Sequence, residues 1–170
     1  MNKKQFWQLI EATRNQVSNP NDSEAVARMA ALLLASLPVE EIVAAEQVLW
    51  DLMVDSYTNP LWAAAYIANG GCSDDGFDYF RGWLITQGRE VFERAVADPD
   101  ALAELPIVQA SAADGVDLEG EDMLGIAWKI SSPRAVSGTA ALDCTSSSGS
   151  VLTGSETGPT RSGTTRVSLS

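Results

Sequence analysis

Apolar residues recur every three or four positions through the first 130 residues, which is the spacing of helices with one buried face. The first such segment carries its apolar face at Phe6, Leu9, Ile10, Thr13 and Val17, and the second at Val26, Met29, Ala30, Leu33, Leu34 and Leu37. No segment shows the alternation of β-branched and polar residues that is typical of a strand. The pattern therefore predicts an all-α fold, a compact bundle of about six helices.

Capping residues, prolines and glycines predict where these helices begin and end. Asn2 is expected to cap the first helix, Asp22 or Ser23 the second, and Ser73 or Asp74 the fifth. The expected helices cover about 3–17, 23–37, 38–57, 61–69 and 74–87, with a bend at Gly88 before a continuation to 96, a short helix from Asp98-Pro99 and a last one over 119–129. Residues 106–118 are expected to form a loop.

The chain changes character near Lys129. All twelve aromatic residues lie in 1–130, and 25 of the last 40 residues are Ser, Thr, Gly or Pro. A segment this polar cannot bury enough apolar surface to offset the entropy that folding costs. We therefore expect a helical domain over 1–130 and a Ser/Thr/Gly-rich, disordered C-terminal tail over 131–170.

The formal net charge is −12 and the isoelectric point is about 4.2. Phosphate backbones and anionic membranes repel such a surface, so neither nucleic acid nor a membrane is an expected partner. We interpret the acidity mainly as a contribution to solubility, with recognition of a basic partner as the alternative. No apolar stretch approaches the roughly 20 residues that cross a bilayer. Charge also interrupts the first apolar residues before a signal sequence develops, so a cytoplasmic location is expected.

The chain contains no histidine. Ser-His-Asp and Cys-His catalysis are therefore excluded, and so are histidine-rich metal sites. Cys72 and Cys144 are too few for a zinc site, and a disulfide between them is not expected in the cytoplasm. The glycines form neither a phosphate-binding loop nor a dinucleotide fingerprint, because no strand precedes them. We expect no cofactor and no dedicated metal centre.

The densest chemistry lies in residues 73–85, which hold three carboxylates, one arginine and four aromatic side chains. Asp74 and Asp78 are four residues apart, and Asp78 and Arg81 are three apart, so all three share one helix face. The favoured interpretation is structural. Asp74 and Asp75 stabilise the helix N-terminus, and Asp78 pairs with Arg81.

The same residues allow a functional interpretation, an anionic pocket for a divalent cation or a cationic ligand. Gly76 and Gly82 each cost about 1 kcal/mol relative to Ala inside a helix. We interpret them as positions where another helix approaches closely, with Trp62 or Trp83 as the approaching residue, and the alternative is a ligand that approaches the backbone. Aromatic residues at this spacing are more often core residues than ligand contacts. The candidate ligand-binding residues are Asp74, Asp75, Asp78, Arg81, Trp83, Asn69 and Trp62.

Several short motifs resemble one bacterial family. They are Phe6-Trp7 with Leu9-Ile10-Glu11, Pro38 with Glu40-Glu41-Ile42-Val43, the block from Asn69 to Ile85, Gln87-Gly88-Arg89 and the Asp98-Pro99 step. Together they resemble the family filed as "domain of unknown function 4240" over about residues 1–130. The resemblance implies a small, helical, cytosolic bacterial protein with no assigned activity, and it supplies no catalytic residues. It also implies that five residues matter to the fold or to a site: Asp74, Asp75, Asp78, Arg81 and Trp83.

The tail departs from that family, whose members continue with further acidic and aromatic helical sequence. A reading-frame change near Ile130, which leaves an out-of-frame extension over 131–170, is the favoured interpretation. A natural disordered tail is the alternative.

We expect a non-enzymatic module that binds a protein partner or a small ligand through the Asp74–Trp83 block, because no complete catalytic set is present. Whether the chain is an enzyme is left open. The alternative is a hydrolase-like enzyme that uses Asp74, Asp75 and Asp78 as acid and base with a divalent metal, helped by Glu11 or Glu46. A homodimer is a third interpretation, because helices rich in Ala and Leu often pair.

Overall fold

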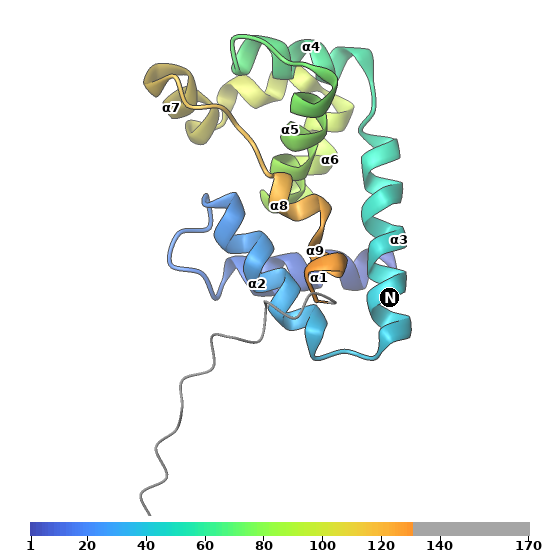
Figure 1. Ribbon diagram of the computed structural model, residues 1–170. Coiled ribbons are helices and arrows are strands. Elements are labelled where there is room, and N and C mark those ends of the chain that lie inside the picture. Colours follow the sequence, from blue (N-terminus) through green and yellow to red (C-terminus); the bar gives the residue numbers. More distant parts are fainter. Residues whose placement is uncertain (131–170) are drawn as a thin grey trace, which may run out of the picture. The chain divides into compact units, whose positions relative to one another are not determined.

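The computed structural model describes residues 1–130, which contain helices and no strand (Figure 1). The all-α class expected from the sequence is confirmed. The predicted disordered tail, 131–170, lies outside the described residues. No helix in the described part is long and apolar enough to cross a membrane. The helices are α1 (Lys3–Arg14), α2 (Ser23–Ala35), α3 (Val39–Asp55), α4 (Asn59–Ala68), α5 (Asp74–Thr86), α6 (Arg89–Ala97), the 3-10 helix η1 (Pro99–Glu104), α7 (Pro106–Asp114), α8 (Glu121–Leu124) and α9 (Ile126–Ile130).

Four of these helices begin at a side-chain cap. The Asn2 side chain accepts a hydrogen bond from the Gln5 backbone, and the Gln5 side chain accepts one from the Asn2 backbone, which together form a capping box. Asp22, Thr58 and Ser73 accept backbone N–H groups in the same way at the starts of α2, α4 and α5. The cap expected at Asn2 is confirmed, and Asp22 and Ser73 are the caps where the sequence left two alternatives.

The helix boundaries differ from the expected ones. Helix α1 ends at Arg14, three residues before the expected end, and three larger differences lie further along the chain. Gly88 has a φ of 94°, a value that side chains rarely allow, so α5 ends before it and α6 is a separate helix. Residues 106–118, expected as a loop, contain α7, which starts at a proline and ends at Gly115 with a φ of 65°. The last expected helix is divided into α8 and α9 around Gly125.

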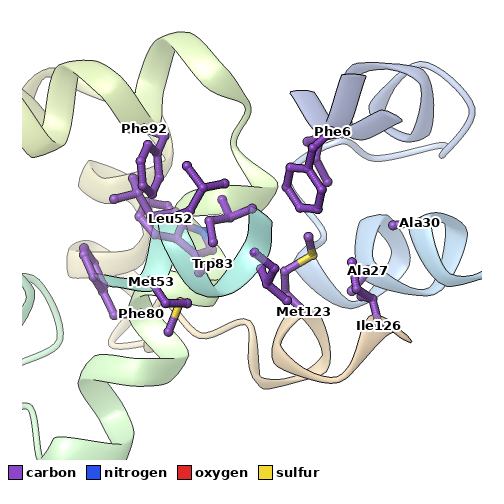
Figure 2. Close-up of a cluster of buried hydrophobic side chains, with 14 of the residues drawn as sticks. Phe6, Ala27, Ala30, Leu52, Met53, Phe80, Trp83, Phe92, Met123 and Ile126 are labelled. Carbon is purple, nitrogen blue, oxygen red and sulfur yellow. The ribbon is translucent and has the colours of Figure 1, made fainter. Parts of the chain in front are cut away.

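Side chains from most of the helices meet in one buried cluster (Figure 2). Helix α5 lies at its centre, since every residue from Phe80 to Thr86 is buried. A helix that is buried on nearly all sides must pack against several neighbours. The labelled side chains of Figure 2 show this, with Phe6 from α1, Leu52 from α3, Trp83 from α5 and Met123 from α8 in the same cluster.

Helix α1 holds the C-terminal end of α5. Arg14 donates hydrogen bonds through Nη1 to the carbonyl oxygens of Thr86 (2.5 Å) and Pro20 (3.0 Å). Thr86 is the last residue of α5, where carbonyl oxygens lack helical partners and the helix dipole is negative, so a cation is favoured there. This contact fixes one end of the central helix.

The backbone before α8 crosses α5 in direct contact. The Gly120 N–H donates to the Tyr79 carbonyl oxygen (2.9 Å). A β-carbon added at Gly82 would lie 2.4 Å from the Gly120 carbonyl oxygen, and one added at Gly120 would lie 2.4 Å from the Trp83 backbone nitrogen. Both positions therefore require glycine. The close approach expected at Gly82 exists, and this backbone makes it instead of Trp62 or Trp83.

We expect Gly82→Ala to lower the free energy of unfolding by about 1–3 kcal/mol, because its methyl group would overlap the backbone of Gly120. In an unobstructed helix the same change stabilises by about 1 kcal/mol. Gly125→Ala is the control, since a β-carbon there meets no atom within 4 Å. Urea-induced unfolding followed by circular dichroism measures both variants, and equal stability of the two would contradict the crossing.

Candidate functional site

The residues expected to form a site on α5 divide into exposed and buried ones. Asp74 and Asp75 lie exposed in the first turn, and Asp78 is half-buried. Arg81 and Trp83 are buried, with 4% and 2% of their surfaces exposed. The predicted set therefore presents its carboxylates to solvent and keeps its arginine inside.

Arg81 joins α5 to α3. Its guanidinium donates to the Met53 carbonyl oxygen and to the Asp78 carboxylate, and its Nε donates to the Phe77 carbonyl oxygen at 3.4 Å. It also lies over the rings of Tyr57 and Phe77, 4.8 Å from each centroid. Met53 belongs to the last turn of α3, whose carbonyl oxygens lack helical partners and attract a cation. The expected Asp78–Arg81 ion pair is confirmed.

Trp62 and Asn69 make contacts within the protein. The Trp62 ring stacks on Phe77 at a centroid distance of 5.0 Å, and its Nε1 donates to the Cys72 carbonyl oxygen at 3.1 Å. The Asn69 side chain accepts from the Leu118 N–H (3.0 Å) and donates to the Leu118 carbonyl oxygen (3.4 Å). Asn69 therefore holds in place the segment that crosses α5.

This crossing brings carboxylates from separate segments around Tyr79. Glu121 is the main cause that raises the pKa of the Tyr79 phenol above its usual value. Partial burial raises that pKa further, and so do the charges of Asp75, Glu119 and Asp78. A phenolate would add one more negative charge among these groups, so each of them opposes its formation.

The Cys72 thiol lies close enough to carboxylates of the crossing segment for their charge to change its pKa. Burial raises the pKa of the Cys72 thiol, and the charges of Glu119 and Asp117 raise it further. These carboxylates belong to the segment that Asn69 holds, so they form one surface with the start of α5. We call this surface the acidic face; it consists of Asp75, Asp78, Asp117, Glu119 and Glu121.

A cleft of about 340 Å³ opens beside the acidic face. It lies between the start of α2, α7 and the segment before α8, and its lining includes Asp22, Ser23, Trp83, Asp114, Asp117 and Glu119. Two of its carboxylates belong to the acidic face, so the cleft and the face are continuous. Carboxylates gathered at a cleft concentrate cations there. Of the predicted site residues, Trp83 lines this cleft and Asn69 positions one wall.

Sequence reasoning missed Asp117, Glu119 and Glu121. They lie where a loop and a weak helix were expected, and no local spacing links them to α5. The single relevant signal was Gly82, whose presence inside a helix indicated that another segment approaches there.

The acid–base alternative needs two or more of Asp74, Asp75, Asp78 and Glu11 or Glu46 to converge in a pocket. Glu11 lies beside Gly88, beyond the opposite end of α5. Glu46 lies in α3, where its Oε1 accepts a hydrogen bond from Trp50 Nε1 at 3.0 Å. The structure brings neither glutamate to those aspartates. Among the described residues, no group of three or more Cys, Asp or Glu side chains is arranged to hold a metal ion.

The fold and this surface define an all-helical domain with an acidic face. Residues 1–130 match the family model described as a protein of unknown function (DUF4240), and the chain belongs to this family. The match spans the whole described domain and confirms the resemblance seen in the sequence. Comparisons with curated proteins and with solved structures gave no match.

We expect Arg81→Ala to lower the free energy of unfolding by about 2–4 kcal/mol, because it leaves a cavity and unpairs buried acceptors. Asp78→Asn is the matched test of the ion pair and should cost less than about 1 kcal/mol, since 45% of the Asp78 side chain is exposed. Urea-induced unfolding compares the two. Equal losses would show that the ion pair, and not the contact with α3, is the important part.

The pKa of Tyr79 provides a direct test of the acidic face. Glu121→Gln should lower this pKa toward the usual value, because removing a negative charge makes the phenolate easier to form. Added salt should act in the same direction. An NMR titration with ring-labelled tyrosine, assigned with Tyr79→Phe, measures the change. Asp100→Asn, which removes an exposed carboxylate from η1, should leave the pKa of Tyr79 where it is.

Proposed function

We propose that this chain is a non-enzymatic binding module that recognises a basic protein segment through the acidic face. The observation that carries the proposal is the crossing of the 117–121 segment over α5, where the Gly120 N–H donates to the Tyr79 carbonyl oxygen at 2.9 Å and carboxylates line the adjoining cleft. The carboxylates of the acidic face come from α5 and from residues 117–121, so packing assembles them from distant parts of the chain. Clustered charges of one sign speed the encounter with an oppositely charged partner and select it.

Among the residues that the structure describes, few cations offset this surface. Arg81 lies beneath it, but its charge is buried and is directed to Asp78 and to backbone carbonyl oxygens. Arg28, on the neighbouring α2, pairs with Glu24. The acidic face therefore keeps a net negative charge that a partner's arginine or lysine can neutralise.

The cleft supports recognition of a side chain instead of a diffuse charge. Its carboxylates, Asp22, Asp114, Asp117 and Glu119, surround an opening that Trp83 lines in part. Arginine and lysine carry apolar stems below a charged end. A stem against the apolar lining at Ile107 and Val116, with the charged end among the carboxylates, would satisfy both parts of such a side chain.

The carboxylates of α5 are less suited to acid–base catalysis. That chemistry needs two carboxyl groups on either side of a substrate in a cleft. Asp74 and Asp75 are exposed on a helix turn, and Asp78 pairs with Arg81. Electrostatic binding of a basic segment has a weaker geometric requirement, since the carboxylates need only lie on the same surface.

Binding of a labelled, arginine-rich peptide, followed by fluorescence anisotropy, tests the proposal. We expect the triple change Asp117→Asn, Glu119→Gln and Glu121→Gln to weaken binding about tenfold or more, a loss of about 1.4 kcal/mol. The control removes the same number of exposed carboxylates elsewhere, with Glu90→Gln, Glu93→Gln and Asp100→Asn. Equal weakening by both triples would indicate a general effect of net charge and would contradict a specific acidic face.

A further inference from the structure

Helix α3 exposes four large apolar side chains along one face, with Glu46 between the second and the third. Val39, Val43, Trp50 and Val54 are 69%, 63%, 52% and 72% exposed. They are four, seven and four residues apart, which places them on one face of the helix. We call these four residues the α3 stripe; at 1.5 Å per residue it is about 22 Å long.

The other side of α3 already supplies the core. Ala45, Val48, Leu49 and Leu52 are buried there against neighbouring helices. A helix that is apolar on both sides is typical of one buried on both sides. Large apolar patches on an otherwise polar surface mark places where another molecule binds. The α3 stripe therefore has the character of a contact surface.

The tryptophan of the stripe is held in one orientation. Trp50 Nε1 donates to Glu46 Oε1 one turn earlier at 3.0 Å. The second carboxylate oxygen, Glu46 Oε2, is buried and has no hydrogen-bond partner within the described residues. An indole fixed before binding loses little freedom on binding, and tryptophan is among the residues that contribute most at interfaces. Negative charge also lies directly beside the indole.

The negative charge of α3 favours a different protein over a second copy of this chain as the occupant of the stripe. Helix α3 contains five carboxylates and no lysine or arginine. Glu41 pairs with the amino group of Met1 and Asp55 pairs with Lys3. Glu40, Glu46 and Asp51 form no ion pair among the described residues. Two copies packed along their stripes would bring these carboxylates together, and like charges across an interface oppose association. The same charges repel an anionic membrane. A positively charged partner would be attracted by these carboxylates.

We propose that the α3 stripe is a docking surface for a basic amphipathic helix of another protein. The apolar side of that helix covers the valines and Trp50, in the way amphipathic helices lie in apolar grooves. Its lysines or arginines pair with exposed Glu40 and Asp51 beside the stripe. This surface lies on α3 and shares no residue with the acidic face, so the proposal stands independently of the proposed function.

The test uses the full chain and three labelled peptides of about 18 residues. Each has leucines at helical spacing, and the remaining positions are lysine, glutamate or glutamine. Fluorescence anisotropy should show binding of the lysine peptide and little binding of the other two. Trp50→Ala should weaken that binding roughly 30-fold, and Val43→Ser with Val54→Ser should do the same. Ile67→Ser on α4 is the matched control, because Ile67 is 81% exposed outside the stripe and its change should leave binding unaltered.

Several results would overturn the proposal. If the glutamate peptide binds as tightly as the lysine peptide, charge does not select the partner. If the lysine peptide does not bind, the α3 stripe is not a docking surface for a basic helix. Loss of binding in the triple variant at residues 117, 119 and 121, with full binding in the valine variant, would assign the peptide to the acidic face. Light scattering that shows a dimer, converted to a monomer by the valine changes, would make a second copy the occupant. Circular dichroism of each variant checks that the helices are retained.

Discussion

The guanidinium of Arg81 is a charge inside the protein, and such burial is costly unless every part of the group finds a partner. The Met53 and Phe77 carbonyl oxygens and the Asp78 carboxylate accept its hydrogen bonds, and the rings of Tyr57 and Phe77 cover it. These groups come from α5 and from the end of α3, so the charge is satisfied only when the two helices are docked. The position of the central helix therefore depends on a polar contact as well as on the core around it.

The second constraint on α5 is the backbone that crosses it. Gly82 and Gly120 allow this contact, and the Asn69 side chain holds the crossing segment through Leu118. The same contact places the carboxylates of residues 117–121 beside those of α5. Their mutual repulsion opposes the crossing, and the hydrogen bonds and buried contacts offset it. A basic partner at the acidic face would relieve that repulsion.

Within the described part of the chain, most arginines are committed to contacts inside the protein. Arg14 binds the end of α5, Arg81 lies in the interior, and Arg28, Arg89 and Arg94 each pair with a nearby carboxylate. The excess of carboxylates therefore remains at the surface, on the acidic face and along α3. Under the two proposals made above, this negative charge is what each surface offers to a partner of opposite charge.

By itself, the sequence determined the all-helical class, the Asn2 cap and the Asp78–Arg81 pair, because periodicity, capping and pairing at three residues are local properties. It narrowed the caps of α2 and α5 to two residues each and did not identify Thr58 at α4. Helix α7 was not predicted because its apolar residues are distributed around the helix and show no one-sided period. Gly82 indicated that another segment approaches α5 closely, but its position in the sequence does not tell which segment that is. Only the tertiary structure decided that Arg81 is buried and that residues 117–121 join the carboxylates of α5. Both depend on contacts between segments far apart in the chain, which no local pattern encodes.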